Sequence, residues 1–445
     1  MALKAFCYWL QCCSKIPKWI GSFLSLFMVN AFLMGSGKLF GVFFRQLSSQ
    51  LGLNGSVSGL IFVIPSAVSH IMSPLVGTLF ARFSCRQLGT CGGFLLGSNF
   101  ILIGLFATNW MHFLLLAVGA GVGFGLLFFP AVISLHSLAG DNFLILMPLA
   151  STGSCFGVAV LPVISELFLQ QYGLHAAFYL FGALAWHTIP CSLLLDSKPV
   201  RGAEKVIDHE VNRDAVQRDG QNIASTQDDG IFKIAFKFLI TVGKQFRMFR
   251  YTLFVIIFIA TNIRRFVSDT WTLFLIPHNV EMGLEKTTAV VVASFGGVGG
   301  IIGRLLAAVA FTKTCAMSPL GALTVYYVLC GISFVAFEVV TNVYYFYFCS
   351  FCNGLLLSAQ SGMIAGIIAE VFEPPDFRDA FGLIDFGCGV FSLVSGYIAG
   401  GVYDLTGSFK MLFRISALVS VVSASLIVVV IILRKRSFDK NKGDT

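Results

Sequence analysis

Two cations lie inside long apolar runs, and they are the residues most able to do chemistry in this sequence. Lys38 stands in "MGSGKLFGVFF" and Arg304 in "GGVGGIIGRLLAAV". A charge at the centre of a lipid-length helix costs on the order of 2.5 kcal/mol or more, so each is a functional candidate. Either cation could bind an anionic solute in a cavity, and a guanidinium can clamp a carboxylate through two parallel hydrogen bonds. The alternative for both is a side chain that extends along its helix to the membrane surface.

A second set of charged residues in apolar runs could carry protons or balance these cations. Arg265 and Asp269 are four residues apart, on one helix face, where they can neutralise each other. Arg264 has no such partner within its own run. Asp385 and Glu166 could each accept a proton or pair with an arginine. These five residues are therefore candidates for proton coupling or for structural ion pairs.

Two amides complete the candidate set for solute binding. Asn353 and Gln360 are seven residues apart and share a helix face. They could hydrogen-bond a solute, and satisfied amides in a helical core are an equal alternative. Glu370 and Arg45 lie nearer the ends of their apolar runs. The sequence has no metal-ligand spacing, nucleophile elbow or phosphate-binding loop, so we expect no metal site, no cofactor and no enzyme.

The elements that position these residues must be membrane helices. Of the 445 residues 56% are hydrophobic and only 12% are charged. A soluble chain of this length needs more charge to cover its surface, so the excess apolar surface is expected to face a lipid bilayer. The composition therefore predicts an all-α membrane protein with several spans.

Spans of about 20 apolar residues occur twelve times, six on each side of one long polar segment. The predicted spans are 20–44, 56–80, 87–107, 112–136, 143–169, 174–195, 251–277, 288–311, 318–340, 343–370, 379–403 and 409–433. The predicted parts are a cytoplasmic N-terminal segment (1–19), a six-helix bundle (20–195), a cytoplasmic linker (196–250), a second six-helix bundle (251–433) and a cytoplasmic tail (434–445). Two six-helix halves with a long middle loop are typical of the major facilitator architecture, which works by alternating access.

Lysine and arginine set the expected orientation. The side that holds both termini and the linker carries 22 Lys and Arg residues, and the opposite side carries three. Cytoplasmic loops are enriched in these cations, so both termini are expected in the cytoplasm. The net charge of +8 then belongs to a rim that faces lipid headgroups, and no nucleic-acid partner is expected.

Three shorter segments suggest surface features. The stretch "IFKIAFKFLITVGKQFRMFR" interleaves apolar residues with cations, which predicts a helix lying on the bilayer surface; a calmodulin-type target would look similar. Cys7, Cys12 and Cys13 precede the first span and could accept palmitate, or stay unmodified. The sequon at Asn54 is on the predicted outer side, close to the ends of two helices.

Three stretches resemble the monocarboxylate transporters, solute carrier family 16. They are "LMGSGKLFGVFFRQLSSQLGLNGSVSGLIF", "GGIIGRLLAAVA" and "AFGLIDFGCGVFSLVSGYIAGGVYDLTGS", in which the pattern G-x-x-Y-D-x-T-G-S is the most specific piece. The resemblance covers nearly all of residues 20–433. It implies a plasma-membrane carrier of small carboxylates, with Lys38 matching the family's first-helix lysine and Arg304 its substrate-binding arginine. Some members also need a single-span glycoprotein partner to reach the cell surface.

Two departures from the family pattern bear on the mechanism. Proton-coupled members have an aspartate four residues before the arginine, and this chain has Gly300 there. The family's basic segment before the fifth helix is replaced by "SLAGDNFLILMPLASTGS". The expected function is alternating-access transport of a monocarboxylate or related organic acid, proton-linked if Asp269 or Asp385 replaces that aspartate. The alternatives are a proton-independent uniporter of a neutral or zwitterionic solute such as an amino acid, and a non-transporting sensor or partner-binding relative.

Overall fold

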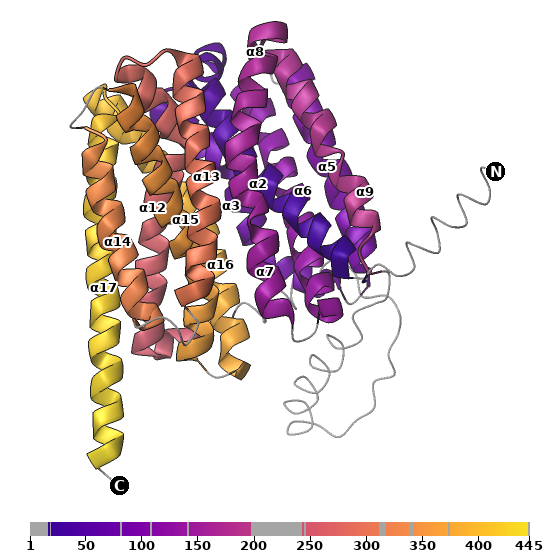
Figure 1. The fold of residues 1–445 in the computed structure, drawn as a ribbon. Helices are drawn as coiled ribbons and strands as arrows, with labels where there is room; N and C mark the ends of the chain where they lie inside the picture. The colour runs from indigo at the N-terminus through magenta and orange to yellow at the C-terminus, as the bar shows by residue number, and fades with distance from the viewer. Residues whose placement is uncertain are drawn as a thin grey trace, which may run out of the picture.

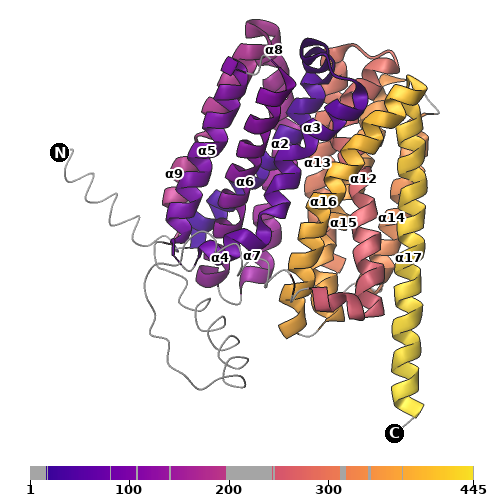
Figure 2. The same cartoon turned by 180° about the vertical axis from the view of Figure 1, so that it is seen from behind.

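The described part of the chain is entirely helical. The computed structural model describes residues 17, 19–80, 82–106, 109–139, 142–196, 243, 246–310, 317–338, 342–372 and 374–443. No strand occurs in these ranges. Figure 1 and Figure 2 show two groups of helices side by side, coloured indigo to magenta and red to yellow. We call the described residues 19–196 the N-terminal half and 246–443 the C-terminal half.

Most elements run from one end of the bundle to the other. The N-terminal half contains α2 (Trp19–Leu51), α3 (Gly55–Ile71), α4 (Ser73–Leu79), α5 (Cys85–Phe106), α6 (Trp110–Ala139), α7 (Phe143–Ser151), α8 (Gly153–Ala185) and α9 (Thr188–Leu193). The C-terminal half contains η2 (Phe246–Arg250), α12 (Thr252–Glu281), α13 (Lys286–Ala310), α14 (Pro319–Ala336), α15 (Val343–Val371), α16 (Pro374–Thr406) and α17 (Lys410–Gly443). We call the end where α2 begins and α17 ends the linker end, and the end with the α2–α3 turn the hairpin end.

The helices agree with the all-α prediction and refine the predicted spans. Within the described ranges, nine helices are long and apolar enough to cross a membrane, and one of these continuous stretches, Leu146–Leu193, covers two predicted spans. Gly173 divides it with the non-helical angles φ 80° and ψ 175°. Two further helices are not among the nine: α3 has only 17 residues, and α12 carries three charged residues in its middle. The count of twelve spans therefore stays a prediction.

Several helices continue past the bounds predicted for their apolar spans. The first span was expected to end at residue 44, but α2 continues to Leu51. The helix α17 runs on to Gly443 and so includes most of the predicted tail 434–445, which stays a prediction. Cys7, Cys12, Cys13 and most of the linker lie outside the described residues. Of the predicted surface helix, the structure describes Gly243 and the short 3-10 helix η2.

Turn chemistry explains why the helices begin where they do. Asn54 precedes α3, and its side chain accepts a hydrogen bond from the backbone N–H of Val57 at 3.0 Å. Ser318 caps α14 in the same way, with Pro319 in the first turn. Such caps satisfy N–H groups that have no partner inside the helix. The asparagine of the sequon therefore has a structural role at the hairpin end.

The main contacts between the two halves are those of α3 with α16, α8 with α13, and α2 with α12. Glycines allow the closest approach. A Cβ atom on Gly59 of α3 would lie 2.2 Å from the backbone oxygen of Gly396 on α16. A Cβ atom on Gly157 of α8 would lie 2.0 Å from the backbone oxygen of Ala31 on α2, inside the N-terminal half. Small residues let membrane helices pack backbone against backbone, and here they bring charged side chains of both halves together.

Candidate functional site

Arg304 lies at the contact between the two halves. It is in α13, near the linker end, and its side chain is half-buried. Its Nη2 lies 3.5 Å from Oγ of Ser154, which is in the N-terminal half, and its Nε is buried without a hydrogen-bond partner. No carboxylate within the described ranges lies within ion-pair distance of this guanidinium. The arginine thus retains hydrogen-bonding capacity for an anion.

The glycine run of α13 explains how Arg304 reaches this position. A Cβ atom on Gly297 would lie 2.5 Å from the backbone nitrogen of Ala159 in α8. A Cβ atom on Gly303 would lie 2.0 Å from the backbone oxygen of Leu355 in α15. The helix α13 therefore packs against both α8 and α15, and its arginine does not point to the bilayer.

Lys38 is fully buried between the halves, so its side chain does not extend to a membrane surface. Its ammonium group donates a hydrogen bond to the backbone oxygen of Trp271 in α12 and lies 4.8 Å from the centroid of that indole ring. An ammonium over an aromatic face is stabilised by the ring quadrupole. Within the described ranges it has no carboxylate partner. Lys38 therefore places a second cation in the same interface, closer to the hairpin end.

The arginines of α12 differ in their partners. Nε of Arg265 lies 3.2 Å from Oδ1 of Asp269, so the pair four residues apart is formed. The other oxygen of Asp269 accepts hydrogen bonds from the hydroxyls of Ser392 and Ser395 in α16. Arg264 is 5% exposed and donates to Ser268 at 3.0 Å, with no carboxylate partner in the part of the chain described.

The Arg265–Asp269 pair also connects the halves, because Nη2 of Arg265 donates to Oγ of Ser66 in α3 at 2.7 Å. Asp269 thus has three polar contacts, one from an arginine and two from serines, already in place. The geometry favours a structural ion pair at this position over a proton carrier.

Asp385 and Glu166 pair with residues that the sequence analysis did not propose. Oδ1 of Asp385 lies 2.9 Å from Nδ1 of His70, and Oε2 of Glu166 lies 3.0 Å from the ammonium of Lys286. Neither forms an ion pair with an arginine in the described ranges. Both pairs join the two halves, and of the two alternatives for these carboxylates, pairing with an arginine does not occur among the described residues. His70 was missed because a single histidine at a helix end carries no local motif.

Asn353 and Gln360 face α14 and not the interface between the halves. Nδ2 of Asn353 donates to Oγ of Ser333 at 2.8 Å, and Nε2 of Gln360 donates to the backbone oxygen of Tyr326 at 3.0 Å. Both side chains are fully buried. These contacts favour the core-amide alternative, so neither residue enters the site proposed below.

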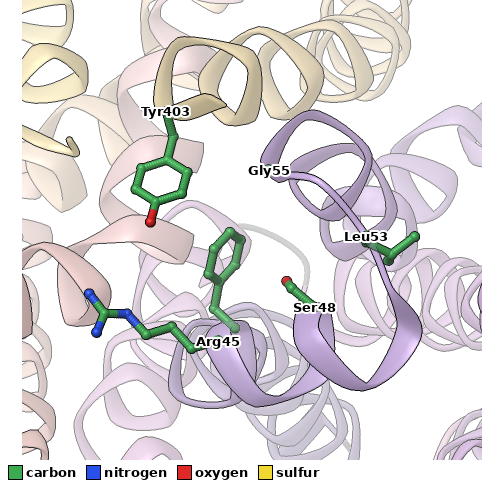
Figure 3. A pocket seen from close by; sticks show the side chains of 6 residues that line it. Arg45, Ser48, Leu53, Gly55 and Tyr403 are labelled. Carbon is green, nitrogen blue, oxygen red and sulfur yellow. The ribbon is translucent and has the colours of Figure 1, made fainter. Parts of the chain in front are cut away.

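The remaining charged residues of the apolar runs lie at the two ends. Glu370 pairs with Arg434 at 2.6 Å at the linker end. Arg45 lines a cavity of about 430 Å³ at the hairpin end, together with Phe44, Ser48, Leu53, Gly55 and Tyr403. Figure 3 shows Tyr403 of α16 and Arg45 of α2 on one side of this cavity, with Ser48 and Leu53 on the other. The cavity lies over the contacts that close this end.

Asp404 is the main polar contact between the halves at the hairpin end. Its two oxygens accept hydrogen bonds from the backbone N–H groups of Gly55 and Ser56 at 2.6 and 2.7 Å, and from the Ser56 hydroxyl at 2.6 Å. A carboxylate at a helix N-terminus also interacts favourably with the helix dipole. The Tyr-Asp pair of the motif G-x-x-Y-D-x-T-G-S therefore holds α16 against the first turn of α3.

Replacing Asp404 with asparagine is expected to loosen this end. The variant loses the charge that strengthens these hydrogen bonds, a change of about 1.5–3 kcal/mol for a hydrogen bond to a charged group. A cysteine introduced at Thr272, which lies against Gly37 between the halves, should then react about tenfold faster with an impermeant thiol reagent. Unchanged reactivity in Asp404→Asn would show that this contact does not hold the halves together.

Comparison with known proteins identifies the architecture. A model of the Major Facilitator Superfamily matches residues 26–337. This chain belongs to the Major Facilitator Superfamily. Among solved structures, a POT family transporter in complex with 5-aminolevulinic acid has a TM-score of 0.68 at 13% identity, covering 92% of this chain and 95% of that one. At that identity the likeness concerns the fold alone.

Curated relatives within the superfamily carry the name monocarboxylate transporter. Monocarboxylate transporter 12 of Mus musculus is 21% identical over 411 residues, which are 92% of this chain and 84% of the relative. Monocarboxylate transporter 6 of Mus musculus is 26% identical over 416 residues, which are 88% of this chain and 82% of the relative. These matches confirm the resemblance inferred from the sequence. The protein is a multi-pass membrane protein of a transporter family and not an enzyme.

Proposed function

We propose that this protein is a secondary carrier that moves a monocarboxylate or a related small organic acid by alternating access. One observation supports this above all: Arg304 lies between the halves, contacts Ser154 of the opposite half, and has no carboxylate partner among the described residues. A guanidinium can bind a carboxylate through two hydrogen bonds. A carboxylate bound there would lie beside the contact between Arg304 and Ser154, which must rearrange when the halves move relative to each other.

Lys38 is the second cation of the proposed site. Its hydrogen bond to the Trp271 backbone crosses the interface between α2 and α12. When the halves separate at the hairpin end, this bond breaks and the ammonium becomes available to an incoming anion. We propose that Lys38 is an outer-side switch, which attracts the solute only when the hairpin end is open.

The direction of the carrier in the membrane follows the charge distribution. We assign the linker end to the cytoplasm and the protein to the plasma membrane, on the excess of Lys and Arg at that end. A proton could travel with the solute, although Gly300 stands where proton-coupled members have an aspartate. A single-span glycoprotein partner for surface delivery remains part of the proposal on resemblance alone.

A second candidate function has its own observation. The Arg265–Asp269 pair and its serine partners form a neutral polar network between the halves. Such a network could serve a zwitterionic or neutral solute moved without a proton. A pH gradient that drives solute accumulation would contradict this alternative, and saturable flux of any solute would contradict a non-transporting sensor.

The proposed function is tested by uptake of a panel of labelled carboxylates and amino acids in a heterologous cell, at two external pH values. We expect saturable uptake of at least one monocarboxylate, above that of cells without the protein. Uptake confined to neutral or zwitterionic solutes would support the second candidate. No uptake of any carboxylate by surface-localised protein would contradict the first.

A further inference from the structure

We infer that His70 and Asp385 form a proton-binding site between the two halves. This inference rests on the proposed carrier function and assigns its coupling ion to a pair of residues. His70 is in the last turn of α3 and Asp385 is in α16, 315 residues further along the chain. The pair supplies a titratable group to the interface between the halves, where Gly300, in place of the family's aspartate, supplies none.

The geometry suits reversible protonation. Nδ1 of His70 and Oδ1 of Asp385 are 2.9 Å apart, with side-chain exposures of 16% and 17%. The other two polar atoms, Nε2 of His70 and Oδ2 of Asp385, are buried without a hydrogen-bond partner. A neutral imidazole that donates from Nδ1 keeps a lone pair on Nε2. Nε2 is therefore the atom that takes up the proton, and among the described residues no group forms a hydrogen bond with it.

The pair lies where the two halves touch. A Cβ atom on Gly389, four residues after Asp385, would lie 2.6 Å from the backbone oxygen of Ala67 and 3.0 Å from the backbone nitrogen of Ile71. The helices α3 and α16 are therefore in backbone contact at this level. The hydrogen bond between His70 and Asp385 can form only when α3 and α16 are in contact.

The two arginines of the neighbouring helix α12 have other partners in this structure. Arg265 pairs with Asp269, and Arg264 donates to Ser268. Within the described ranges the ion-pair partner of Asp385 is therefore His70 of the opposite half.

The elements packed against α3 or α16 carry other charged or titratable groups. Besides Arg264, Arg265 and Asp269, the described ones are Lys38 and Arg45 on α2, His112 and His136 on α6, Arg247 and Arg250 on η2, His278 and Glu281 on α12, Glu370 on α15, Lys410, Arg414, Arg434, Lys435 and Arg436 on α17, and Asp379 and Asp404 on α16 itself.

Proton binding then changes the strength of the contact between the halves. Protonated His70 and ionised Asp385 form an ion pair with no net charge, which holds α3 to α16. When this contact opens and Nε2 releases its proton to water, the pair keeps one negative charge and holds α3 to α16 less strongly. The proton is bound and released at one nitrogen, and no other bond is made or broken. Proton occupancy in this way biases the equilibrium between open and closed conformations.

A measurement without any solute tests this site. Spin labels on Phe83→Cys and Met317→Cys, two exposed linker-end positions in opposite halves, report the separation of the halves in lipid nanodiscs, after the reactive native cysteines have been replaced. We expect the population of the more separated conformer to rise about fivefold or more between about pH 5.5 and pH 7.5. His70→Gln and Asp385→Asn should each remove this response, and Asp385→Glu should retain it.

His175→Gln is the matched control, because His175 is exposed and bonds to Gly104 inside the N-terminal half. This variant should respond to pH like the wild type. The inference is overturned if the wild type shows no change with pH, or if His70→Gln keeps the full response. The measurement needs no transport, so a pH response through His70 with no carboxylate uptake would reject the proposed substrate class and retain the proton site. Carboxylate uptake with no pH response would reject the proton site and retain the proposed substrate class.

Discussion

Replacing Arg304 with alanine is expected to abolish saturable uptake of the carboxylate that the wild type carries. The guanidinium is the cation of the site with the most unused hydrogen-bonding capacity, since its only polar contact among the described residues is the 3.5 Å approach to Ser154. Loss of a charge-assisted pair costs about 3 kcal/mol, which corresponds to about a hundredfold loss of affinity. Uptake of the labelled carboxylate against concentration, normalised to surface protein, measures this effect.

Two further variants separate binding from folding. Arg304→Lys keeps the charge and loses the two-pronged geometry, so a partial loss is expected. Arg434→Ala removes an arginine that pairs with Glu370 at the linker end, and it should leave the half-saturating concentration unchanged. If Arg304→Ala reaches the surface and retains wild-type uptake, Arg304 does not bind the solute.

Replacing Gly400 with alanine is expected to prevent closure at the hairpin end. A Cβ atom on Gly400 would lie 1.8 Å from the backbone oxygen of Gly55, and neither backbone can yield without separating α3 from α16. A carrier that cannot close one end cannot complete its cycle, so uptake should fall at least about tenfold. The cysteine probe at Thr272 should react faster at the same time.

Gly401→Ala is the matched control for this substitution. It adds the same methyl group one residue along α16, where the nearest atom is the Ser56 hydroxyl oxygen at 3.3 Å. A single side chain can adjust to that contact, so uptake should stay close to that of the wild type. Equal loss in both variants, or full activity of Gly400→Ala, would contradict the role assigned to this helix contact.

The sequence predicted those features that depend on local pattern. The apolar runs located the helices, and the cost of burying charge singled out Lys38 and Arg304, both of which lie between the halves. The four-residue spacing of Arg265 and Asp269 predicted an ion pair that the structure contains. In each case one helix carries the whole signal.

Partners that come from the opposite half could not be predicted. Asp385 and His70 are separated by 315 residues, and no spacing rule links them. Asn353 and Gln360 share a helix face as expected, but only the packing of α15 on α14 shows which face that is. Asp404 belongs to the motif G-x-x-Y-D-x-T-G-S, but its contact with the start of α3 is evident only from the tertiary structure.

The helices differ in length from the predicted spans for a physical reason. Apolar runs report the lipid-facing part of a helix, whereas the hydrogen-bonded helix continues until a cap or a glycine ends it. Thus α2 extends to Leu51 before Gly52, which has a positive φ of 63°. Gly173 bends the chain between two predicted spans without a separate loop.

The most direct test of the central claim is counterflow in liposomes that contain the purified protein and a high internal concentration of the unlabelled carboxylate identified by uptake. An alternating-access carrier with Arg304 in its site should accumulate the labelled carboxylate transiently, and Arg304→Ala should show no accumulation above protein-free liposomes. Labelled carboxylate that only equilibrates, or the same transient accumulation with Arg304→Ala, would contradict the account.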